Sequence, residues 1–184
     1  MDRRKFVKTT LAASVAASFP VLSACGEKAK VATEADTALR AVSLDGAEVQ
    51  LTQAMVRELG EAMTGPVMLS GHPAYDTTRM VWNGMHDKRP ALIAQCLSTD
   101  DVVQAVNFAR DHSLLTAIRG GGHSWPGKSV CDDGIMIDLS QMHAVDVDKG
   151  RKVAGTGGGA LLGNLDDAAL AQGLVTCLLY TSPS

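Results

Sequence analysis

Residues 119–127 read Arg-Gly-Gly-Gly-His-Ser-Trp-Pro-Gly and come directly after a short apolar run, residues 114–118. The run is typical of a strand, and the glycine-rich residues form a loop at its carboxyl end. Consecutive glycines leave main-chain N–H groups uncovered by side chains, and concave groups of such amides bind anions, diphosphates in particular. We therefore predict a ligand-binding loop. A flexible turn is the alternative, but it does not require arginine, histidine and tryptophan beside the glycines.

The side chains of this loop add to its binding capacity. Arg119 contributes a positive charge and Ser124 a hydroxyl to the rim, and His123 stands at the end of the glycines, where an anionic cofactor would lie. A lone histidine is more often a satisfied structural group, and no second His, Cys or carboxylate falls at metal-ligand spacing around it, so we predict no metal site. The candidate cofactor-binding residues are Arg119, Gly120, Gly121, Gly122, His123, Ser124 and Gly127.

Regular elements are predicted on both sides of the loop. Residues 91–96 and 135–139 are apolar runs of strand length, and Ser98 begins a helix with acidic residues in its first turn. A strand, a helix and a strand with this spacing form a crossover unit. Farther along the chain, the residues around 148–150 predict a hairpin and residues 160–172 predict a last helix. The predicted fold class is therefore α+β.

The segment before residue 90 is less regular. Residues 25 to about 40 show no periodicity and are interpreted as a flexible linker. Residues 45–63 carry apolar residues at helical spacing, with Thr52 as the predicted N-cap. From Gly65 to Pro90 the chain is rich in turn residues, and we expect an irregular layer over the next domain.

These motifs, taken in order, resemble the flavin-binding domain of the vanillyl-alcohol-oxidase superfamily, in its berberine-bridge-enzyme-like branch. The resemblance runs from about Tyr75 to Val175. It rests on Pro90-Ala91-Leu92-Ile93, Asp101-Val102-Val103, residues 119–124, Gly127, residues 129–134 (Ser-Val-Cys-Asp-Asp-Gly), residues 137–140 (Ile-Asp-Leu-Ser) and residues 157–160 (Gly-Gly-Gly-Ala).

The resemblance implies a cofactor and a reaction. The cofactor is FAD, with its diphosphate on residues 119–124 and its flavin bonded covalently to His123. The reaction is the oxidation of an alcohol, a sugar or a similar C–H donor by hydride transfer to flavin, with oxygen or another acceptor taking the electrons. The family's catalytic base and substrate domain lie farther along the chain than these residues, so no catalytic residue is assigned. We do not expect the 184 residues alone to be active.

The first 25 residues have the composition of a targeting segment. Arg3 and Arg4 stand in a charged start, an apolar run follows over residues 9–22, and small residues precede Cys25. The paired arginines resemble the twin-arginine export signal, and residues 22–25 (Leu-Ser-Ala-Cys) resemble a lipobox, which would place a lipid anchor on Cys25. An amphipathic N-terminal helix is the alternative. We predict export, to the periplasm or to a membrane through the lipid.

The last eight residues, Cys-Leu-Leu-Tyr-Thr-Ser-Pro-Ser over 177–184, do not continue the preceding pattern. They resemble the translation of a transposase sequencing adapter, and a short native strand and tail is the alternative. We expect the natural protein to continue beyond Thr176. The predicted organisation is an export signal and lipobox over 1–25, a linker and helical N-terminal layer over 26–89, a truncated FAD-binding subdomain over 90–176, and foreign residues over 177–184.

Composition and charge narrow the function classes. The chain is 46% hydrophobic and 20% charged, which is ordinary for a globular protein, and its net charge of −3 comes with no basic block beyond the first ten residues. Nucleic-acid binding therefore has no electrostatic footprint. The small-molecule substrate is what the family resemblance implies. Cys96 and Cys131 do not make a disulfide framework, and we interpret each as a small buried thiol. A disulfide between them in an oxidising compartment is the alternative.

Two other functions stay open at this point. Residues 155–160 (Gly-Thr-Gly-Gly-Gly-Ala) match the G-x-G-x-x-G/A fingerprint and open a helix, which is typical of a Rossmann-type NAD-binding protein. The preceding strand, however, is predicted as the second arm of a hairpin and not as the first strand of a βαβ unit. A non-catalytic exported binding lipoprotein is the other alternative, and it would be purified without the yellow colour of flavin.

Overall fold

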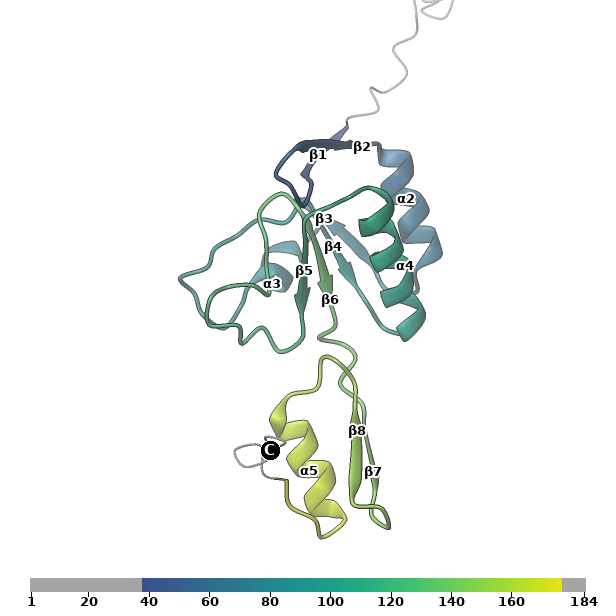
Figure 1. The fold of residues 1–184 in the computed structure, drawn as a ribbon, viewed down its shortest axis with the longest axis vertical. Coiled ribbons are helices and arrows are strands. Elements are labelled where there is room, and N and C mark those ends of the chain that lie inside the picture. Colours follow the sequence, from purple (N-terminus) through teal and green to yellow (C-terminus); the bar gives the residue numbers. More distant parts are fainter. Residues whose placement is uncertain (1–37, 177–184) are drawn as a thin grey trace, which may run out of the picture. The chain divides into compact units, whose positions relative to one another are not determined.

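The computed structural model describes residues 38–176, and the structural statements below concern these residues. The predicted export signal, the lipid site at Cys25 and the adapter-like tail lie outside them. The central sheet has the strand order β3-β4-β6-β5 (Figure 1), formed by β3 (Val67–Leu69), β4 (Leu92–Gln95), β6 (Ile135–Asp138) and β5 (Thr116–Arg119). β6 runs parallel to both β4 and β5, whereas β3 is antiparallel to β4.

The predicted crossover unit is present. Helix α4 (Thr99–Asp111) connects β4 to β5, and both strands pair in parallel with β6, which lies between them. The strands therefore form within a residue or two of the predicted positions. Their order in the sheet differs from their order in the sequence because the third strand inserts between the first two.

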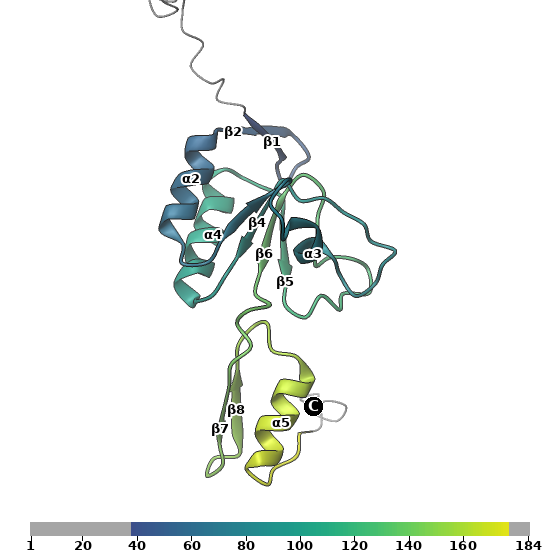
Figure 2. The ribbon, with the colours of Figure 1, turned by 180° about the vertical axis from the view of Figure 1, so that it is seen from behind.

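Helices α2 (Gln53–Ala62) and α4 cover one face of this sheet, and α3 (Tyr75–Arg79) lies on the other face (Figures 1 and 2). Successive strand side chains point to opposite faces. The face covered by α2 and α4 buries strand residues Leu92, Ala94, Ile135 and Ile137 against helix residues Val56, Leu59, Ala105 and Ala109. The opposite side buries Ile93 and Met136 together with Met68, Tyr75 and Val130. Because both faces are covered, β4 and β6 read as continuous apolar runs in the sequence.

Both predicted helix starts are confirmed. The Oγ1 of Thr52 accepts a hydrogen bond from the N–H of Met55 at 3.2 Å, and the Oγ of Ser98 accepts one from the N–H of Asp101 at 3.2 Å. α2 nevertheless begins later than residue 45, because residues 48–51 form β2 (Glu48–Leu51), paired antiparallel with β1 (Leu39–Val42). The predicted linker also ends earlier than residue 40, where β1 has already begun.

The expectation of an irregular layer from Gly65 to Pro90 is wrong in part. β3 and α3 both fall inside this segment, and β3 extends the sheet that begins the next predicted domain. Three residues are too few for a strand period to show in the sequence. The pairing of β3 with β4 instead depends on a tertiary contact, in which Met68 is buried beside Ile93.

The predicted hairpin and last helix are confirmed. β7 (Val145–Asp148) pairs antiparallel with β8 (Val153–Thr156), and α5 (Leu162–Ala171) follows. Gly173 ends the helix with φ +70°, a left-handed conformation that glycine adopts without strain. Within residues 38–176 no helix combines the length and apolar character that crossing a membrane requires.

A buried carboxylate joins the end of α2 to the start of α4. Asp101 is 1% exposed, and its oxygens accept hydrogen bonds from the N–H groups of Thr64 at 2.7 Å, Leu97 at 2.8 Å and Gly65 at 3.2 Å. Burial acts to raise the pKa of Asp101. The hydrogen bonds from Thr64, Leu97 and Gly65 outweigh burial and hold the pKa below its ordinary value.

Substituting Asp101→Asn is expected to lower the free energy of unfolding by about 1.5–3 kcal/mol near neutral pH, because a charged acceptor of several hydrogen bonds is lost. The folded pKa lies below the unfolded one, so this stabilisation is complete above about pH 4 and disappears as the pH falls through the folded pKa. Urea unfolding of both proteins across the acid range should therefore show the two stabilities converging. A difference that stays constant into strong acid would contradict the assignment.

Candidate functional site

The glycine-rich loop leaves the sheet at its carboxyl edge. In the paired strands β5 and β6, Arg119 lies opposite Asp138, so the loop after β5 and the residues after β6 start side by side. The N–H of Leu139 donates to the carbonyl of Arg119 at 2.8 Å and fastens the two segments together. Open α/β sheets bind their ligands outside the carboxyl ends of parallel strands. The loop predicted from the sequence therefore lies where such a sheet places a binding site.

The main chain of the loop is held by its carbonyls and leaves its amides free. Gly122 has φ +71°, and its carbonyl accepts a hydrogen bond from the N–H of Trp82 at 3.1 Å. Within the described residues, no N–H of residues 120–124 donates to a main-chain carbonyl. Amide groups left in this way on a turn that includes a left-handed glycine can bind an anion.

Arg119 lies differently from the rim position expected of it. Its side chain is 19% exposed, and its Nη1 donates to Oδ1 of the fully buried Asp138 at 3.2 Å. The guanidinium is therefore paired with a carboxylate below the loop. Its Nε is buried and has no hydrogen-bond partner within the described residues. An unpaired buried donor is costly, so this N–H is a candidate for contact with a ligand.

His123 is exposed at the end of the glycines. Its ring lies 5.8 Å from the ring of Trp82, centroid to centroid, at an interplanar angle of 37°. In the part of the chain that the structure describes, its imidazole makes no hydrogen bond or ion pair, so neither ring nitrogen is engaged by another protein group.

Ser124 and Gly127 shape the far end of the loop. The carbonyl of Ser124 accepts from the N–H of Gly127 at 3.0 Å, and its Oγ accepts from the N–H of Lys128 at 3.1 Å. Gly127 has φ +68°, and a Cβ there would lie 2.4 Å from Cγ of His86. These contacts explain why serine and glycine stand at these positions. Their contact with a cofactor stays a prediction.

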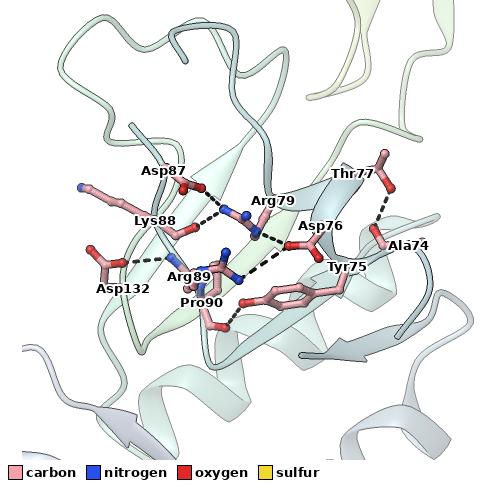
Figure 3. Close-up of polar contacts among 10 residues, drawn as sticks. All are labelled: Ala74, Tyr75, Asp76, Thr77, Arg79, Asp87, Lys88, Arg89, Pro90 and Asp132. Carbon is pink, nitrogen blue, oxygen red and sulfur yellow. Dashed lines mark hydrogen bonds and ion pairs between the residues drawn. The ribbon is translucent and has the colours of Figure 1, made fainter. Parts of the chain in front are cut away.

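An ion-pair cluster around Arg79 fixes the segment that borders the loop (Figure 3). Arg79 is buried, and its Nε donates to Asp76 at 2.8 Å while its Nη1 contacts Asp87 and the carbonyl of Lys88. The hydrogen bond and positive charge of Arg79 lower the pKa of Asp87 below its ordinary value. This cluster was not predicted from the sequence. Its one local signal is the i, i+3 spacing of Asp76 and Arg79 in a short helix.

The segment fixed by Arg79 in turn holds the loop. Asn83 Nδ2 and His86 Nε2 lie 3.3 and 2.9 Å from the carbonyl oxygen of Trp125, and Lys88 Nζ lies 3.3 Å from that of Gly127. The residues before 90 are therefore part of the candidate site, because their side chains hydrogen-bond to the main-chain carbonyls of the loop.

The second glycine-rich segment packs against the residues after β6. The N–H of Gly157 donates to Ala144 at 2.8 Å, and the N–H of Gly159 donates to Met142 at 3.1 Å. A Cβ at Gly159 would lie 1.8 Å from the carbonyl oxygen of Leu139. Close backbone packing thus accounts for these glycines. Moreover, the strand before them is the antiparallel arm β8, which lacks the βαβ context that the NAD fingerprint requires.

The two cysteines of the body are buried free thiols, as predicted. Burial raises the pKa of the Cys96 thiol to about 12 and that of Cys131 to about 11, so neither is a thiolate at neutral pH. Among residues 38–176 no three His, Cys, Asp or Glu side chains are gathered in a way that could hold a metal ion.

Comparison with known proteins gives a family match over the second half of the chain. The model of a family described as FAD binding domain matches residues 90–184. The (R)-6-hydroxynicotine oxidase of Paenarthrobacter nicotinovorans is 36% identical over 113 residues, which are 61% of this chain and 25% of that protein. The FAD-linked oxidoreductase hasG of Aspergillus fumigatus is 38% identical over 108 residues, 59% of this chain and 23% of that one. The chain thus spans about a quarter of the length of these relatives.

Solved structures show the same likeness. The crystal structure of 6-hydroxy-D-nicotine oxidase from Arthrobacter nicotinovorans has a TM-score of 0.59 and 36% identity, covering 61% of this chain and 25% of that one. BBE-like 1 of Physcomitrella patens has a TM-score of 0.56 at 24% identity, covering 60% and 24%, and this second likeness concerns the fold alone.

Substituting Gly120→Ala is expected to destabilise the protein by about 1–3 kcal/mol, because the new Cβ would lie 2.6 Å from the carbonyl oxygen of Gly158 and the main chain must shift. Gly163→Ala is the matched control. It stands in α5 with nothing within 4 Å of the added Cβ, so it should leave stability unchanged or raise it by about 1 kcal/mol. Urea unfolding measures both. Equal effects would show that the two glycine segments do not pack as described.

Proposed function

Because this chain belongs to the FAD binding domain family, in the vanillyl-alcohol-oxidase type of fold that its sequence predicts, we propose that it forms the diphosphate-binding part of an FAD-dependent oxidoreductase. The loop of residues 119–124 would hold the FAD diphosphate. The observation that carries this proposal is the row of unpaired amides at the carboxyl edge of β5.

The residues of the site fit an anionic dinucleotide. The loop glycines carry no side chain, so the main chain is open to close approach by a phosphate group. The free N–H groups and the unpaired Nε of Arg119 are donors, and a diphosphate offers only acceptors to match them. When bound, FAD supplies the hydride-accepting ring. The residues described here bind and orient the nucleotide.

The proposed reaction is the oxidation of an alcohol, a sugar or a similar C–H donor, with oxygen or another acceptor taking the electrons. The relatives support the flavin-linked oxidation and not the substrate class: one at 36% identity is an oxidase named for a hydroxynicotine, and another is an FAD-linked oxidoreductase. The chain covers about a quarter of each, so the substrate pocket and the catalytic base are assigned to no residue of this chain.

We further infer that His123 would bond covalently to the flavin. A ring nitrogen that gives up its proton would replace one hydrogen of the flavin 8α methyl group, and the two electrons removed would pass through the flavin to oxygen or another acceptor. The exposed imidazole of His123 follows the glycines directly and is free of hydrogen bonds within the described residues, and a neutral imidazole nitrogen is a nucleophile near neutral pH.

In the full-length protein that contains this chain, acid precipitation is expected to leave the yellow colour in the pellet. The His123→Ala variant should release its flavin into the supernatant, because the amides of residues 120–122 still bind FAD without the covalent bond. Absorbance spectra of both fractions measure the result. Native protein that releases all of its flavin in acid contradicts the covalent bond, and native protein purified without flavin contradicts the whole proposal.

We also propose export, on the charged start, apolar run and small residues before Cys25. Replacing Arg3 and Arg4 together with lysine should hold the protein in the cytoplasm, because the twin-arginine signal depends on the arginine pair. Cys25→Ala should instead abolish labelling by radioactive fatty acid. Cell fractionation and labelling of an epitope-tagged protein test both. Unchanged export of the double-lysine variant would refute the twin-arginine assignment.

A further inference from the structure

Asp138 carries the most concentrated set of polar contacts below the loop. Its side chain is completely buried, and it accepts four hydrogen bonds from three residues. Gln95 Nε2 and Ser140 Oγ donate to Oδ2, both at 2.9 Å, while Arg119 Nη1 at 3.2 Å and the N–H of Ser140 at 3.1 Å donate to Oδ1.

This carboxylate lies in one row across the three parallel strands. Gln95 of β4 is the register partner of Asp138 in β6, and Arg119 of β5 is its partner on the other side. A buried carboxylate is expensive unless it is paired, and a well-packed apolar side chain of similar volume is often at least as stabilising. Stability alone therefore does not explain an aspartate here. The hydrogen bond from Arg119 to Asp138 does fix the orientation of the Arg119 guanidinium.

The guanidinium that Asp138 fixes has one group without a partner. Arg119 Nε is buried and unpaired within the described residues, and it lies 3.5 Å from the position that a Cβ on Gly122 would occupy. Gly122 is the left-handed residue of the loop. The unpaired donor is thus held directly against the main chain that forms the proposed diphosphate site.

We propose that Asp138 is a positioning residue for nucleotide binding, which holds Arg119 beneath the loop so that Nε–H remains available to the anionic diphosphate. The proposal rests on the proposed function, because it names a further residue of the same site. It predicts the direction in which FAD affinity changes when the charge of Asp138 is removed. Removing a negative charge beside an anion site would tighten binding if only charge mattered. Removing a positioning group weakens binding, because Arg119 loses its fixed orientation.

The test uses the full-length protein in the His123→Ala background, where FAD binds reversibly and its dissociation constant can be measured by flavin fluorescence. Asp138→Asn is nearly isosteric and removes the charge, and it should weaken FAD binding about tenfold, the loss of roughly one hydrogen bond to a charged group. Asp101→Asn is the matched control. Asp101 is equally buried and accepts three main-chain hydrogen bonds near α4, so the variant should lose thermal stability yet keep its FAD affinity.

A double-mutant cycle shows whether Asp138 acts through Arg119. Arg119→Gln alone should weaken FAD binding, and adding Asp138→Asn to it should weaken binding little further. If Asp138→Asn does not fold, Ser140→Ala serves instead. It removes one donor to Asp138, keeps both charges, and should weaken FAD binding by about threefold.

The outcomes separate the two proposals. FAD affinity that is unchanged or tighter in Asp138→Asn, or effects of the two substitutions that simply add, overturns the positioning role and leaves FAD binding by the loop intact. If Ser140→Ala is the variant in use, unchanged FAD affinity overturns it equally. A full-length His123→Ala protein that binds no FAD at all overturns the proposed function, and the positioning role with it.

Discussion

The parallel pairing of β6 with both β4 and β5 determines where everything else in the site can lie. Parallel strands end at a common edge, so the loop after β5 and the segment after β6 begin as neighbours and need little further structure to meet. The row Gln95, Asp138 and Arg119 is the last register position of these strands. Polar residues are tolerated there because Asp138 accepts hydrogen bonds from Gln95 on one side and Arg119 on the other. The row is the boundary between the apolar core and the loop above it.

The two glycine-rich segments each contain three consecutive glycines, residues 120–122 and 157–159, for different physical reasons. In the first, glycine permits the positive φ of Gly122 and leaves amides open to a ligand. In the second, glycine permits the main chain to press against the carbonyl of Leu139, and its amides at Gly157 and Gly159 are already used. Spacing in the sequence cannot separate these cases, which is why residues 155–160 match a dinucleotide fingerprint. The pairing of their amides does separate them.

Much of the fold could be predicted from local sequence, because its long elements carry strong local signals. Thr52 and Ser98 are caps whose oxygen has an amide within reach, and residues 91–96 and 135–139 are apolar on both faces. β3 was not predicted, since a strand of three residues forms through its partner and not through a local period. β1 and β2 were missed although Asp45-Gly46 between them is a hairpin signal. The Arg79 cluster was missed for a related reason: Asp87 and Lys88 reach Arg79 only after the segment has folded back.

The strand period of β5 does not by itself place Arg119, because the sequence does not show which face of the strand is buried. In the structure β5 alternates, with Ala117 buried and Ile118 exposed, so Arg119 must fall on the same side as Ala117 and not on the open rim. An arginine on the buried side needs a carboxylate, and the sole acidic residue in the apolar run 135–139 is Asp138. The pairing has a consequence for binding. A rim arginine must be immobilised when a ligand arrives, whereas a guanidinium already fixed by Asp138 loses little freedom. In the proposed site its contribution to affinity would therefore come from preorganisation more than from net charge.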